Sequence, residues 1–450
     1  VGLLSHLSGG RNMHKQEAGA LADGGVYKAK HTALQIRVVV FAFLAALLDG
    51  LDLQIIAYAA PAIAKNLSLT ESSLGIIFSG GFAGLAAGSI LVAPLGDRWG
   101  RRPIIISCLV LFGACVLITP LAANAQQLFV LRVFTGLGLG GVMPNAIAIS
   151  MEFAASRLRA SMVSFTYFGF IIGGAAGGIV AATLIPLVGW KGMMFVVGLP
   201  PFMLALVLFF FLPESPEYRA NKERATNRTN SIHNARGDGT SESAEHGRAL
   251  RSSPMREIFS LENRRNSALM WLAMFANLSV AFGILQWLPT LLNQAGFALG
   301  SANSLVALLW ISTAPGVILM LYVANMLGLP RAVGLFLCVG SVVTFGLGVV
   351  IATAASDAVW LLMVGIGMTV TAAQVGFYSL LTAVYPGSSR VTGIGWAQGV
   401  GRLGAVVGPS AIGFLLAGGT STIALFAYVS IPVLISAVAV WQVRPLRLAA

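Results

Sequence analysis

Twelve long runs of apolar residues dominate the pattern of the chain. They lie at about residues 38–62, 73–95, 103–123, 127–152, 160–186, 193–212, 267–292, 302–327, 332–354, 358–385, 391–417 and 422–442. Because a helix of about 20 apolar residues is long enough to cross the hydrocarbon core of a bilayer, each run predicts a membrane-spanning helix. We therefore expect an all-α polytopic membrane protein with six spans, a polar interval and six further spans.

The polar intervals predict how the chain is divided. The longest interval holds ten Lys and Arg and a centre rich in Ser, Asn and Gly, and such a segment buries too little apolar surface to fold alone. The expected units are a cytoplasmic N-terminal tail (1–35), a six-helix bundle (36–212), a cytoplasmic linker (213–266), a second six-helix bundle (267–442) and a cytoplasmic C-terminal tail (443–450). Met13 is a candidate for the first residue of the natural chain, and we expect no regular structure before it.

The two halves of the chain resemble each other at a spacing of about 230 residues. The pairs are Asp97 with Asn325, Gly100 with Gly328, Gly136 with Gly365, Gly138 with Gly367 and Arg159 with Arg390. A spacing close to half the length indicates duplication of a six-helix unit. Two such units around a central cavity are typical of secondary transporters. Chance matching of glycines in Gly-rich helices is the alternative interpretation.

Composition and charge agree with a membrane location. Hydrophobic residues make up 57% of the chain and charged residues 10%, whereas soluble domains average about 25% charged residues. The net charge of +12 does not indicate nucleic-acid binding, because nearly all Lys and Arg fall on one side of the predicted topology. The exceptions are Lys65, Lys191, Arg132 and Arg402. This asymmetry predicts cytoplasmic termini in a cell (inner) membrane, with the lipid bilayer as the partner of the excess charge.

Two carboxylates lie deep in the first predicted span, at Asp49 and Asp52. Ionisable groups at that depth are costly and indicate function, and a spacing of three residues puts both on one helix face. Two close carboxylates in a low dielectric cannot both ionise cheaply, so one is expected to hold a proton near neutral pH. We interpret the pair as the proton-coupling site, since all five His lie outside the spans. A structural pair around Gly50 is the alternative.

Two arginines also lie within predicted spans, Arg132 near the outer end of the fourth and Arg402 in the middle of the eleventh. Burial cannot neutralise a guanidinium, so each needs an anion. For Arg402 the anion is Asp49, Asp52, a substrate carboxylate, or each in turn. We favour the last, because an exchange of partners would couple proton movement to substrate binding. A static ion pair is the alternative for both arginines.

Other polar and aromatic residues of the spans are candidates for a substrate site. Gln374 and Tyr378, and likewise Gln398 and Arg402, are four residues apart and share a helix face. The remaining candidates are Trp396, Tyr167, Gln286 and Trp310, although intramembrane aromatic residues pack more often than they bind. The glycine runs at 136–141 and 173–178 are expected to allow close helix packing, and the three cysteines to be small core residues.

Several motifs resemble the major facilitator superfamily. Gly-Asp-Arg-Trp-Gly-Arg-Arg (96–102) is similar to its signature loop, and Arg-Val-Phe-Thr-Gly-Leu-Gly-Leu-Gly-Gly (132–141) to its fourth helix. Pro-Glu-Ser-Pro (213–216) resembles the exit from its sixth helix. Asp-Gly-Leu-Asp-Leu-Gln (49–54) and the segment 392–409 are similar to the aromatic acid:proton symporter branch. The resemblance covers about residues 35–442 and implies the two-bundle major facilitator fold.

The resemblance also implies roles for individual residues. The acidic pair Asp49 and Asp52 would be needed for transport, and Arg402 would lie near the substrate carboxylate. The gating residues would be Asp97, Arg101, Arg102 and Arg390, which form a cytoplasmic charge latch, and Arg132 with Glu152, the charged pair of the fourth helix. The residues alone suggest instead that Glu152 pairs with Arg157 or Arg159.

Two departures from the family pattern matter. The second copy of the signature loop, Ala-Asn-Met-Leu-Gly-Leu-Pro-Arg (324–331), has Asn325 where an acid is usual and lacks the basic pair. We therefore expect a weakened latch in the C-terminal half. The fifth span lacks the Gly-Pro motif typical of exporters, which favours uptake.

These observations predict proton-coupled uptake (symport) of a monocyclic aromatic carboxylate by alternating access. The membrane potential opposes entry of an anion by about 2.3 kcal/mol per 100 mV, and accompanying protons remove that penalty. We expect a monomer that is not an enzyme and uses no metal or cofactor. The alternatives are symport of another organic anion or small metabolite, and a non-transporting membrane sensor or intramembrane enzyme. No hydrolytic or metal-binding motif supports an enzyme, and the linker is too short and polar for a sensor domain.

Overall fold

The structure is a computed structural model that describes residues 6–154, 159–220, 222–223, 264–353, 356–385 and 390–443. Side chains are described within those ranges except at 6–33, 159–160, 356–357 and 390–391. The regular elements in these ranges are all helical, as the apolar runs predict. Most of the expected linker and the C-terminal tail from residue 444 lie outside the described residues.

The N-terminal half contains seven helical segments. They are α1 (His6–Leu67), α2 (Glu71–Leu91), α3 (Leu95–Trp99), α4 (Arg101–Ile118), the 3-10 turn η1 (Thr119–Leu121), α5 (Ala125–Phe153) and α6 (Arg159–Phe211). Only the part of α1 from Leu34 onward is apolar enough to span a membrane. The expectation that residues before Met13 have no regular structure is wrong from His6 onward, because α1 begins there.

The C-terminal half contains α9 (Arg264–Gln294), α10 (Leu299–Leu327), α11 (Leu329–Ala352), α12 (Ser356–Ile366), η3 (Gly367–Thr371), α13 (Ala372–Val384), α14 (Arg390–Ala417) and α15 (Thr422–Trp441). A π-helical turn, η3, joins α12 to α13 within one span. This turn rotates the residues that follow it, Gln374 and Tyr378 among them, relative to the α12 face.

Helix α6 accounts for two of the twelve predicted spans. Among the described residues, eleven helices are long and apolar enough to cross a membrane, and the apolar part of α6 alone has 51 residues. At 1.5 Å per residue it would be about 75 Å long, more than twice the hydrocarbon thickness. The chain leaves helical geometry inside it at Gly189, with φ 69° and ψ 173°. The fifth and sixth spans therefore lie on either side of Gly189, which gives twelve crossings.

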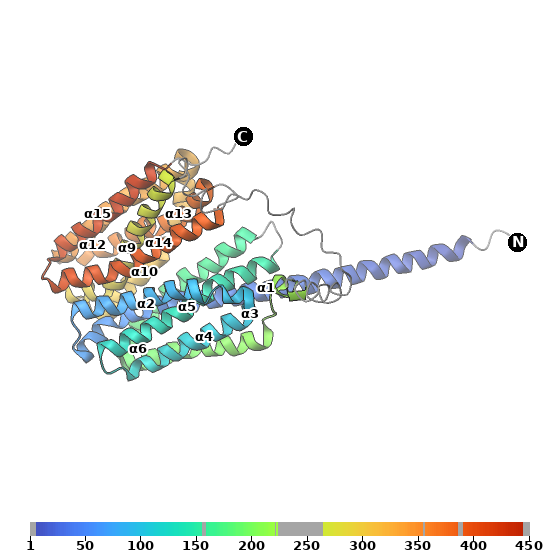
Figure 1. Cartoon of the computed structure of the whole chain (residues 1–450), viewed down its shortest axis with the longest axis horizontal. Helices are drawn as coiled ribbons and strands as arrows, with labels where there is room; N and C mark the ends of the chain where they lie inside the picture. Colours follow the sequence, from blue (N-terminus) through green and yellow to red (C-terminus); the bar gives the residue numbers. More distant parts are fainter. Residues whose placement is uncertain are drawn as a thin grey trace, which may run out of the picture.

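The two halves form two helical bundles that lie side by side (Figure 1). Helices α1, α2 and α6 of the first half contact α9, α14 and α10 of the second half, respectively. We call the end that carries the 68–70 turn between α1 and α2 the closed end, because the contacts between halves gather toward it. The opposite end carries α3. The ribbons diverge from the closed end toward the α3 end (Figure 1).

Glycines allow the helices to approach closely, as the sequence predicts. A Cβ on Gly136 would lie 2.1 Å from the carbonyl oxygen of Gly81, and one on Gly173 would lie 2.0 Å from that of Leu47. The repeat is visible in the backbone too. Gly100 and Gly328, which align in the two halves, both have positive φ, at 102° and 85°. Each ends one helix and begins the next, so the duplicated sequence makes the same turn twice.

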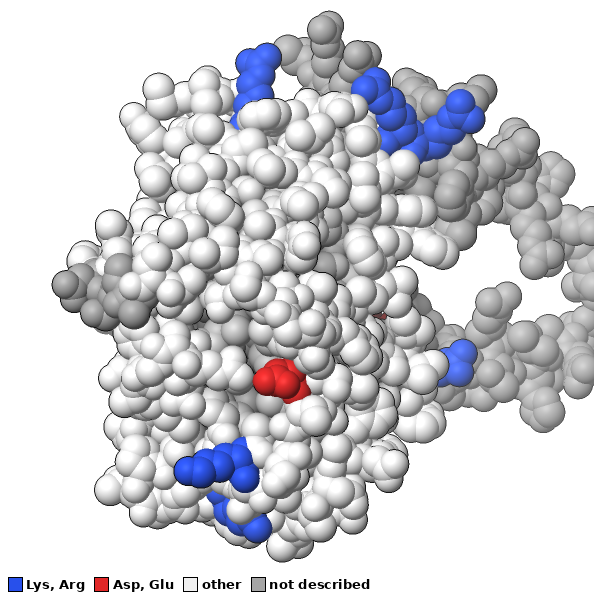
Figure 2. Space-filling view, turned by 90° about the vertical axis from the view of Figure 1, so that its left-hand side faces the viewer, with Lys and Arg blue, Asp and Glu red and all other residues white. Residues whose placement is uncertain are grey.

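The outer surface of the bundles is suited to lipid. Large apolar side chains such as Leu187, Ile318 and Val342 are more than two-thirds exposed, which is favourable when hydrocarbon is the solvent. The face at the closed end carries few charged side chains (Figure 2). Lys65 lies in the last turn of α1 and Glu71 in the first turn of α2, and Lys191 follows the break in α6 at Gly189. This scarcity agrees with the predicted one-sided distribution of Lys and Arg.

Candidate functional site

A cavity between the halves brings together most of the predicted substrate residues. It leaves about 100 Å³ for the centres of water molecules. Its polar lining comes from α1, α2, α6, α13 and α14, and consists of Asp49, Ser89, Tyr167, Gln374, Tyr378, Gln398 and Arg402. The spacing of four residues on α13 and on α14 places each pair on the cavity face. The structure therefore joins at one place residues that are up to 353 positions apart, from Asp49 to Arg402.

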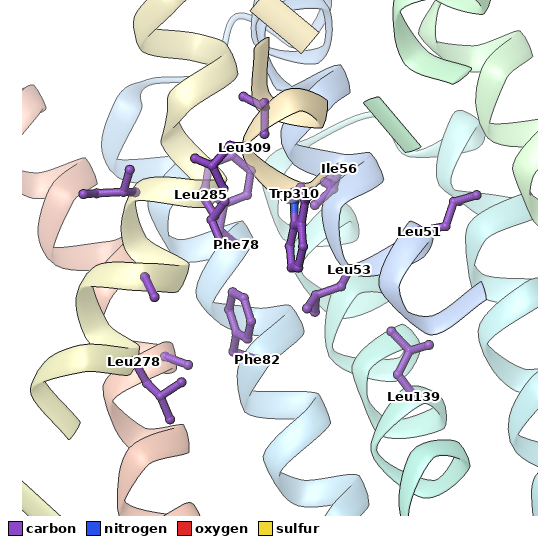
Figure 3. Packing of buried hydrophobic residues seen from close by; sticks show 14 of the residues in the cluster. Leu51, Leu53, Ile56, Phe78, Phe82, Leu139, Leu278, Leu285, Leu309 and Trp310 are labelled. Atoms are coloured by element: carbon purple, nitrogen blue, oxygen red, sulfur yellow. The ribbon is translucent and has the colours of Figure 1, made fainter. Parts of the chain in front are cut away.

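Apolar side chains make up the rest of the cavity wall. Phe82 of α2, Phe170 of α6 and Phe282 of α9 line it together with Leu53 and Leu278. The rings of Phe82 and Phe282 meet from opposite halves at 4.8 Å between centroids. Figure 3 shows Phe82 and Leu53 pointing toward the space between α2, α1 and α9, with Leu278 on the α9 side. A flat apolar ring with one anionic group matches such a lining.

Two phenol groups meet across the cavity from opposite halves. The hydroxyl oxygens of Tyr167 and Tyr378 are 3.1 Å apart, and either one can be the donor. A second, smaller pocket adjoins the cavity there, since Tyr167, Phe170, Phe282 and Gln374 line both. Trp310 lines this adjoining pocket, and its ring meets Phe170 edge-on at 5.7 Å. The tyrosine pair thus presents hydroxyl groups to whatever occupies the cavity.

Asp49 and Arg402 face the same cavity and interact electrostatically. Asp49 is 3% exposed, and its Oδ1 atom has no hydrogen-bond partner among the described residues. Arg402 makes no ion pair within 4.0 Å to any side chain that the structure describes. The guanidinium therefore has donors available for an anion that enters the cavity. This arrangement agrees with the prediction that Arg402 binds a substrate carboxylate.

Asp52 occupies a different environment from Asp49, one turn further along α1. Its Oδ2 atom lies 3.7 Å from Nη1 of Arg132, and both side chains are almost fully buried. Arg132 also donates to Oγ1 of Thr135 at 3.3 Å. Asp52 and Arg132 line a small separate cavity together with Gln286. Of the two aspartates proposed as anions for Arg402, Asp49 lines the same cavity as Arg402, whereas Asp52 pairs with Arg132.

Polar contacts join the two halves toward the closed end. Ser79 of α2 donates to the carbonyl oxygen of Val406 at 2.5 Å, and its hydroxyl lies 2.6 Å from that of Ser410 on α14. Gly75 allows this approach, because a Cβ there would lie 2.8 Å from the carbonyl oxygen of Pro409. At the α3 end, the hydrogen bonds and ion pairs of Arg101, Glu152 and Asn145 lie within the N-terminal half. The polar contacts of Ser79 with α14 therefore close the cavity on the side of the closed end.

The predicted latch residues form a network within the N-terminal half. Arg101 makes ion pairs with Glu152 at 2.9 Å and with Asp97 at 3.4 Å. Glu152 in turn accepts a hydrogen bond from the hydroxyl of Ser215. Arg102 donates to the carbonyl oxygen of Phe209 instead. The network ties α3, α4, α5 and the segment after α6 into one unit at the α3 end.

Glu214 contacts two of the predicted latch residues, Arg101 and Arg102, and the sequence interpretation missed it. Its Oε1 atom accepts hydrogen bonds from the backbone N–H groups of Arg101 at 2.9 Å and Arg102 at 3.2 Å. These are orphan donors at the start of α4, where a carboxylate is stabilising. The only sign of this contact in the sequence is the carboxylate in the motif 213–216, which resembles the exit from the sixth helix. The partner helix start, more than 110 residues away, could not be identified from the sequence.

Two predicted substrate residues, Trp396 and Gln286, lie elsewhere. Trp396 does not line the central cavity; it stacks on Trp271 at 5.6 Å between ring centroids. Gln286 is buried behind the cavity wall, where it donates to the backbone of Leu53. The side chain of Arg390 is outside the described residues, so its part in the latch stays a prediction.

Arg132 and Glu152, the two charged residues predicted on the fourth helix, do not pair with each other. Arg132 lies 20 residues before Glu152 on α5, about 30 Å along the helix, and its acidic partner is Asp52. Glu152 pairs with Arg101. The alternative partners of Glu152, Arg157 and Arg159, lie outside the described side chains. Within the described part of the chain, no three His, Cys, Asp or Glu side chains gather in a way that could hold a metal ion.

Comparison with known proteins agrees with this geometry. The family model of the Major Facilitator Superfamily matches residues 42–409. The chain is 32% identical over 380 residues to the 4-hydroxybenzoate transporter PcaK of Pseudomonas aeruginosa, a match that covers 83% of this chain and 84% of that protein. It is 33% identical over 405 residues to the 3-(3-hydroxy-phenyl)propionate transporter of Escherichia coli, covering 89% of this chain and 91% of the relative.

Solved structures show the same fold. The xylose transporter XylE from E. coli in an inward open conformation matches with a TM-score of 0.71 at 17% identity, covering 91% of this chain and 96% of that one. A bacterial homologue of the lysosomal transporter Spinster matches with a TM-score of 0.69 at 18% identity, covering 90% and 95%. The duplicated helical bundles, the signature loop and these matches lead to one conclusion. The chain is a multi-pass membrane transporter that belongs to the Major Facilitator Superfamily.

Proposed function

We propose that this transporter takes up a monocyclic aromatic carboxylate together with one or more protons. The observation that carries the proposal is the presence of Arg402 and Asp49 in the lining of one cavity walled by phenylalanine rings. The relatives named above transport 4-hydroxybenzoate and a hydroxyphenylpropionate, and a gallate transporter of Pseudomonas putida is 30% identical over 415 residues. These three substrates share a single aromatic ring and a carboxylate.

In the proposed complex, Arg402 and Gln398 bind the substrate carboxylate. They lie one helical turn apart on α14 and both face the cavity. The ring packs against Phe82, Phe170 and Phe282, which exclude water from its faces. Hydrogen bonds to a charged partner contribute about 1.5–3 kcal/mol each, so the arginine provides the largest single polar contribution to binding.

Proton coupling follows from the electrostatics of the cavity. The substrate anion and Asp49 would compete for the same guanidinium, because both face Arg402 in the cavity and Arg402 makes no ion pair with a described side chain. A buried carboxylate that loses its cation is costly unless it takes up a proton. Substrate binding to Arg402 would therefore favour a protonated Asp49, and release of the substrate would favour a charged one. The proton that accompanies the anion offsets the work done against the membrane potential.

Alternating access provides the transport step. We propose that the closed end faces the periplasm and that both termini are cytoplasmic, in a bacterial inner membrane, as the positive-inside rule indicates. The contacts of Ser79 with α14 would then close the cavity to the periplasm, while the α3 end opens to the cytoplasm. The network of Arg101, Asp97 and Glu152 would close the cytoplasmic side in the opposite state, with Arg390 as its expected partner. We propose that one chain suffices for this cycle and works as a monomer.

Uptake into proteoliposomes tests the function. Labelled 4-hydroxybenzoate should accumulate when the external pH is lower than the internal pH, and a protonophore should abolish accumulation. Arg402→Gln should reduce uptake by about 10- to 100-fold, the loss expected when charged hydrogen bonds to the carboxylate disappear. Arg331→Gln is the matched control, because Arg331 is an exposed arginine of the same half that does not line the cavity. Accumulation that persists with the protonophore would overturn proton coupling, and stronger competition by a non-aromatic acid would overturn the substrate class.

A further inference from the structure

The cavity around Asp52 has a feature that the central cavity lacks. Its lining comes from α1, α2 and α5 of the N-terminal half, with a single contribution from the C-terminal half, the side chain of Gln286 on α9. It leaves about 20 Å³ for the centres of water molecules, and a water needs about 10–15 Å³ of such space. One water molecule therefore fits between Asp52, Arg132 and Gln286.

Unpartnered polar atoms belong to the residues that line this small cavity. Both carboxylate oxygens of Asp52 and the Oε1 atom of Gln286 are buried without a hydrogen-bond partner among the described residues. Asp52 is 1% exposed and Gln286 is 2% exposed. Such atoms are rare in folded proteins and call for an explanation. The Nε atom of Arg132 is a buried donor without a described partner in the same lining, and it can satisfy a charged Asp52. A protonated Asp52 carries a donor of its own, which can satisfy the Oε1 atom of Gln286.

Gln286 is at the same time a link between the halves. Its Nε2 atom donates to the carbonyl oxygen of Leu53, the residue after Asp52, at 3.0 Å. That bond occupies the amide nitrogen and leaves the Oε1 atom of Gln286 without a described partner. The amide nitrogen of Gln286 thus contacts the backbone of α1, and Gln286 also lines the cavity of Asp52.

We propose that Gln286 is the residue through which the C-terminal half detects the proton on Asp52. This inference rests on the proposed function. When Asp52 is protonated, its hydroxyl donates directly to the Oε1 atom of Gln286. When Asp52 is charged, it pairs with Arg132 and offers Gln286 no donor. Protonation therefore adds a bond between the halves and stabilises the state with the closed end shut.

The two carboxylates of α1 have separate tasks in this scheme. Asp49 responds to the substrate through Arg402, and Asp52 carries the proton signal between halves through Gln286. The other charged or titratable groups that act on Asp52 from the described elements are Arg132 on α5, Asp49 on α1 and, through a weaker electrostatic contact, Cys115 on α4. None of these groups belongs to the C-terminal half. Gln286 is the polar residue of that half in the lining of the Asp52 cavity, so it can transmit the change in protonation of Asp52 to the C-terminal half.

Gln54 provides a matched control. It makes the reciprocal contact, in which its Nε2 atom donates to the carbonyl oxygen of Leu285 at 3.5 Å. It is also fully buried, but it does not line the cavity of Asp52. Replacing either glutamine by methionine preserves the side-chain volume and removes one hydrogen bond between the halves that the side-chain amide donates. Only the change at Gln286 should alter the response to protons.

The test compares Gln286→Met with Gln54→Met in proteoliposomes. In Gln286→Met, the pH at which uptake falls to half should move downward by about 0.5–1 pH unit, because the protonated form loses one hydrogen bond. Exchange of labelled substrate at equal pH on both sides should stay within about twofold of the wild type. Gln54→Met should leave the pH profile unchanged. Equal pH profiles for the two variants would overturn the proposal, and so would loss of exchange in Gln286→Met at normal membrane levels.

A spectroscopic measurement keeps the proposal testable if Gln286→Met is poorly expressed. In infrared difference spectra of the full chain, the carbonyl stretch that disappears in Asp52→Asn belongs to the protonated carboxyl group. This band should shift to higher frequency in Gln286→Asn, whose shorter side chain breaks the bond while keeping an amide. An unshifted band would contradict the inference. Wild-type uptake that resists a protonophore would instead contradict the proposed function, so the two failures are distinguishable.

Discussion

Tyr167 and Tyr378 connect the two halves inside the cavity, and this contact carries a prediction about substrate choice. Their hydroxyl groups lie 3.1 Å apart and close to the ring-sized space between the phenylalanines. A ring hydroxyl on the substrate can join or replace this hydrogen bond, whereas an unsubstituted ring cannot. The pair is therefore expected to favour hydroxylated acids over benzoate.

The variant Tyr378→Phe isolates this effect. It should raise the KM for 4-hydroxybenzoate by about fivefold, the cost of one neutral hydrogen bond, while the KM for benzoate changes little. Competition assays with both acids against one labelled substrate measure the ratio directly. Equal changes for the two acids would show that the tyrosine only packs. Trp310→Phe, which changes the adjoining pocket without touching the tyrosine pair, serves as the control for general cavity damage.

At the scale of elements, Gly189 decides how one long apolar helix becomes two spans. Its φ of 69° and ψ of 173° lie in a region that glycine occupies almost alone. A Cβ there would meet no heavy atom within 4 Å. Any cost of substitution must therefore come from the backbone and not from a clash.

We predict that Gly189→Ala destabilises the folded protein by about 1–3 kcal/mol through this backbone strain. Thermal unfolding in detergent should show a lower Tm than the wild type. Gly300→Ala is the control, because its Cβ would lie at an ordinary 3.5 Å from the carbonyl oxygen of Ala182 and its backbone needs no unusual φ. A Tm for Gly189→Ala that equals that of the control would mean that the break between the spans relaxes easily.

The π-helical turn η3 has a comparable role within its own span. It occupies Gly367–Thr371, directly before the helix that carries Gln374 and Tyr378. The Thr371 hydroxyl donates to the carbonyl oxygen of Gly367 at 2.6 Å and lies 2.8 Å from that of Thr313 on α10. π turns of this kind occur frequently at functional sites. Here the turn sets the direction in which both cavity residues point.

At the scale of the whole molecule, the polar contacts between halves lie in the middle and toward the closed end. The cavity should therefore be accessible from the α3 end. Ser89 lines the cavity near the end of α2 on that side, whereas Ser79 is held between the halves by Val406 and Ser410. Cys108 and Cys115 are buried, so a background with Cys338→Ser is expected to be unreactive.

In that background, Ser89→Cys should react rapidly with a water-soluble thiol reagent, and saturating substrate should slow the reaction. Ser79→Cys should react slowly in the same state. Labelling of inside-out and right-side-out vesicles also determines which membrane side the α3 end faces. Fast labelling of Ser79→Cys together with protection of Ser89→Cys would show that the opposite state predominates in the membrane.

The sequence by itself determined the crossings, the duplication and the chemistry of the site. Apolar length predicts a span because lipid offers the backbone no hydrogen bonds, and a buried charge such as Arg402 stands out because lipid tolerates so few of them. Six of the predicted residues, Asp49, Tyr167, Gln374, Tyr378, Gln398 and Arg402, indeed line one cavity. Local spacing was enough to select the pairs on α13 and α14, since neighbours one turn apart share a face.

Only the tertiary structure decided which groups meet. Asp49 and Asp52 share a helix face in the sequence, yet they face different cavities because different helices pack beside each one. Arg132 pairs with Asp52 and Glu152 with Arg101, and Glu214 contacts the start of α4. Gln286 does not line the substrate cavity and instead lies at the boundary between the halves. Such partners depend on how whole helices rotate and pack against one another, and no periodicity along a single helix contains that information.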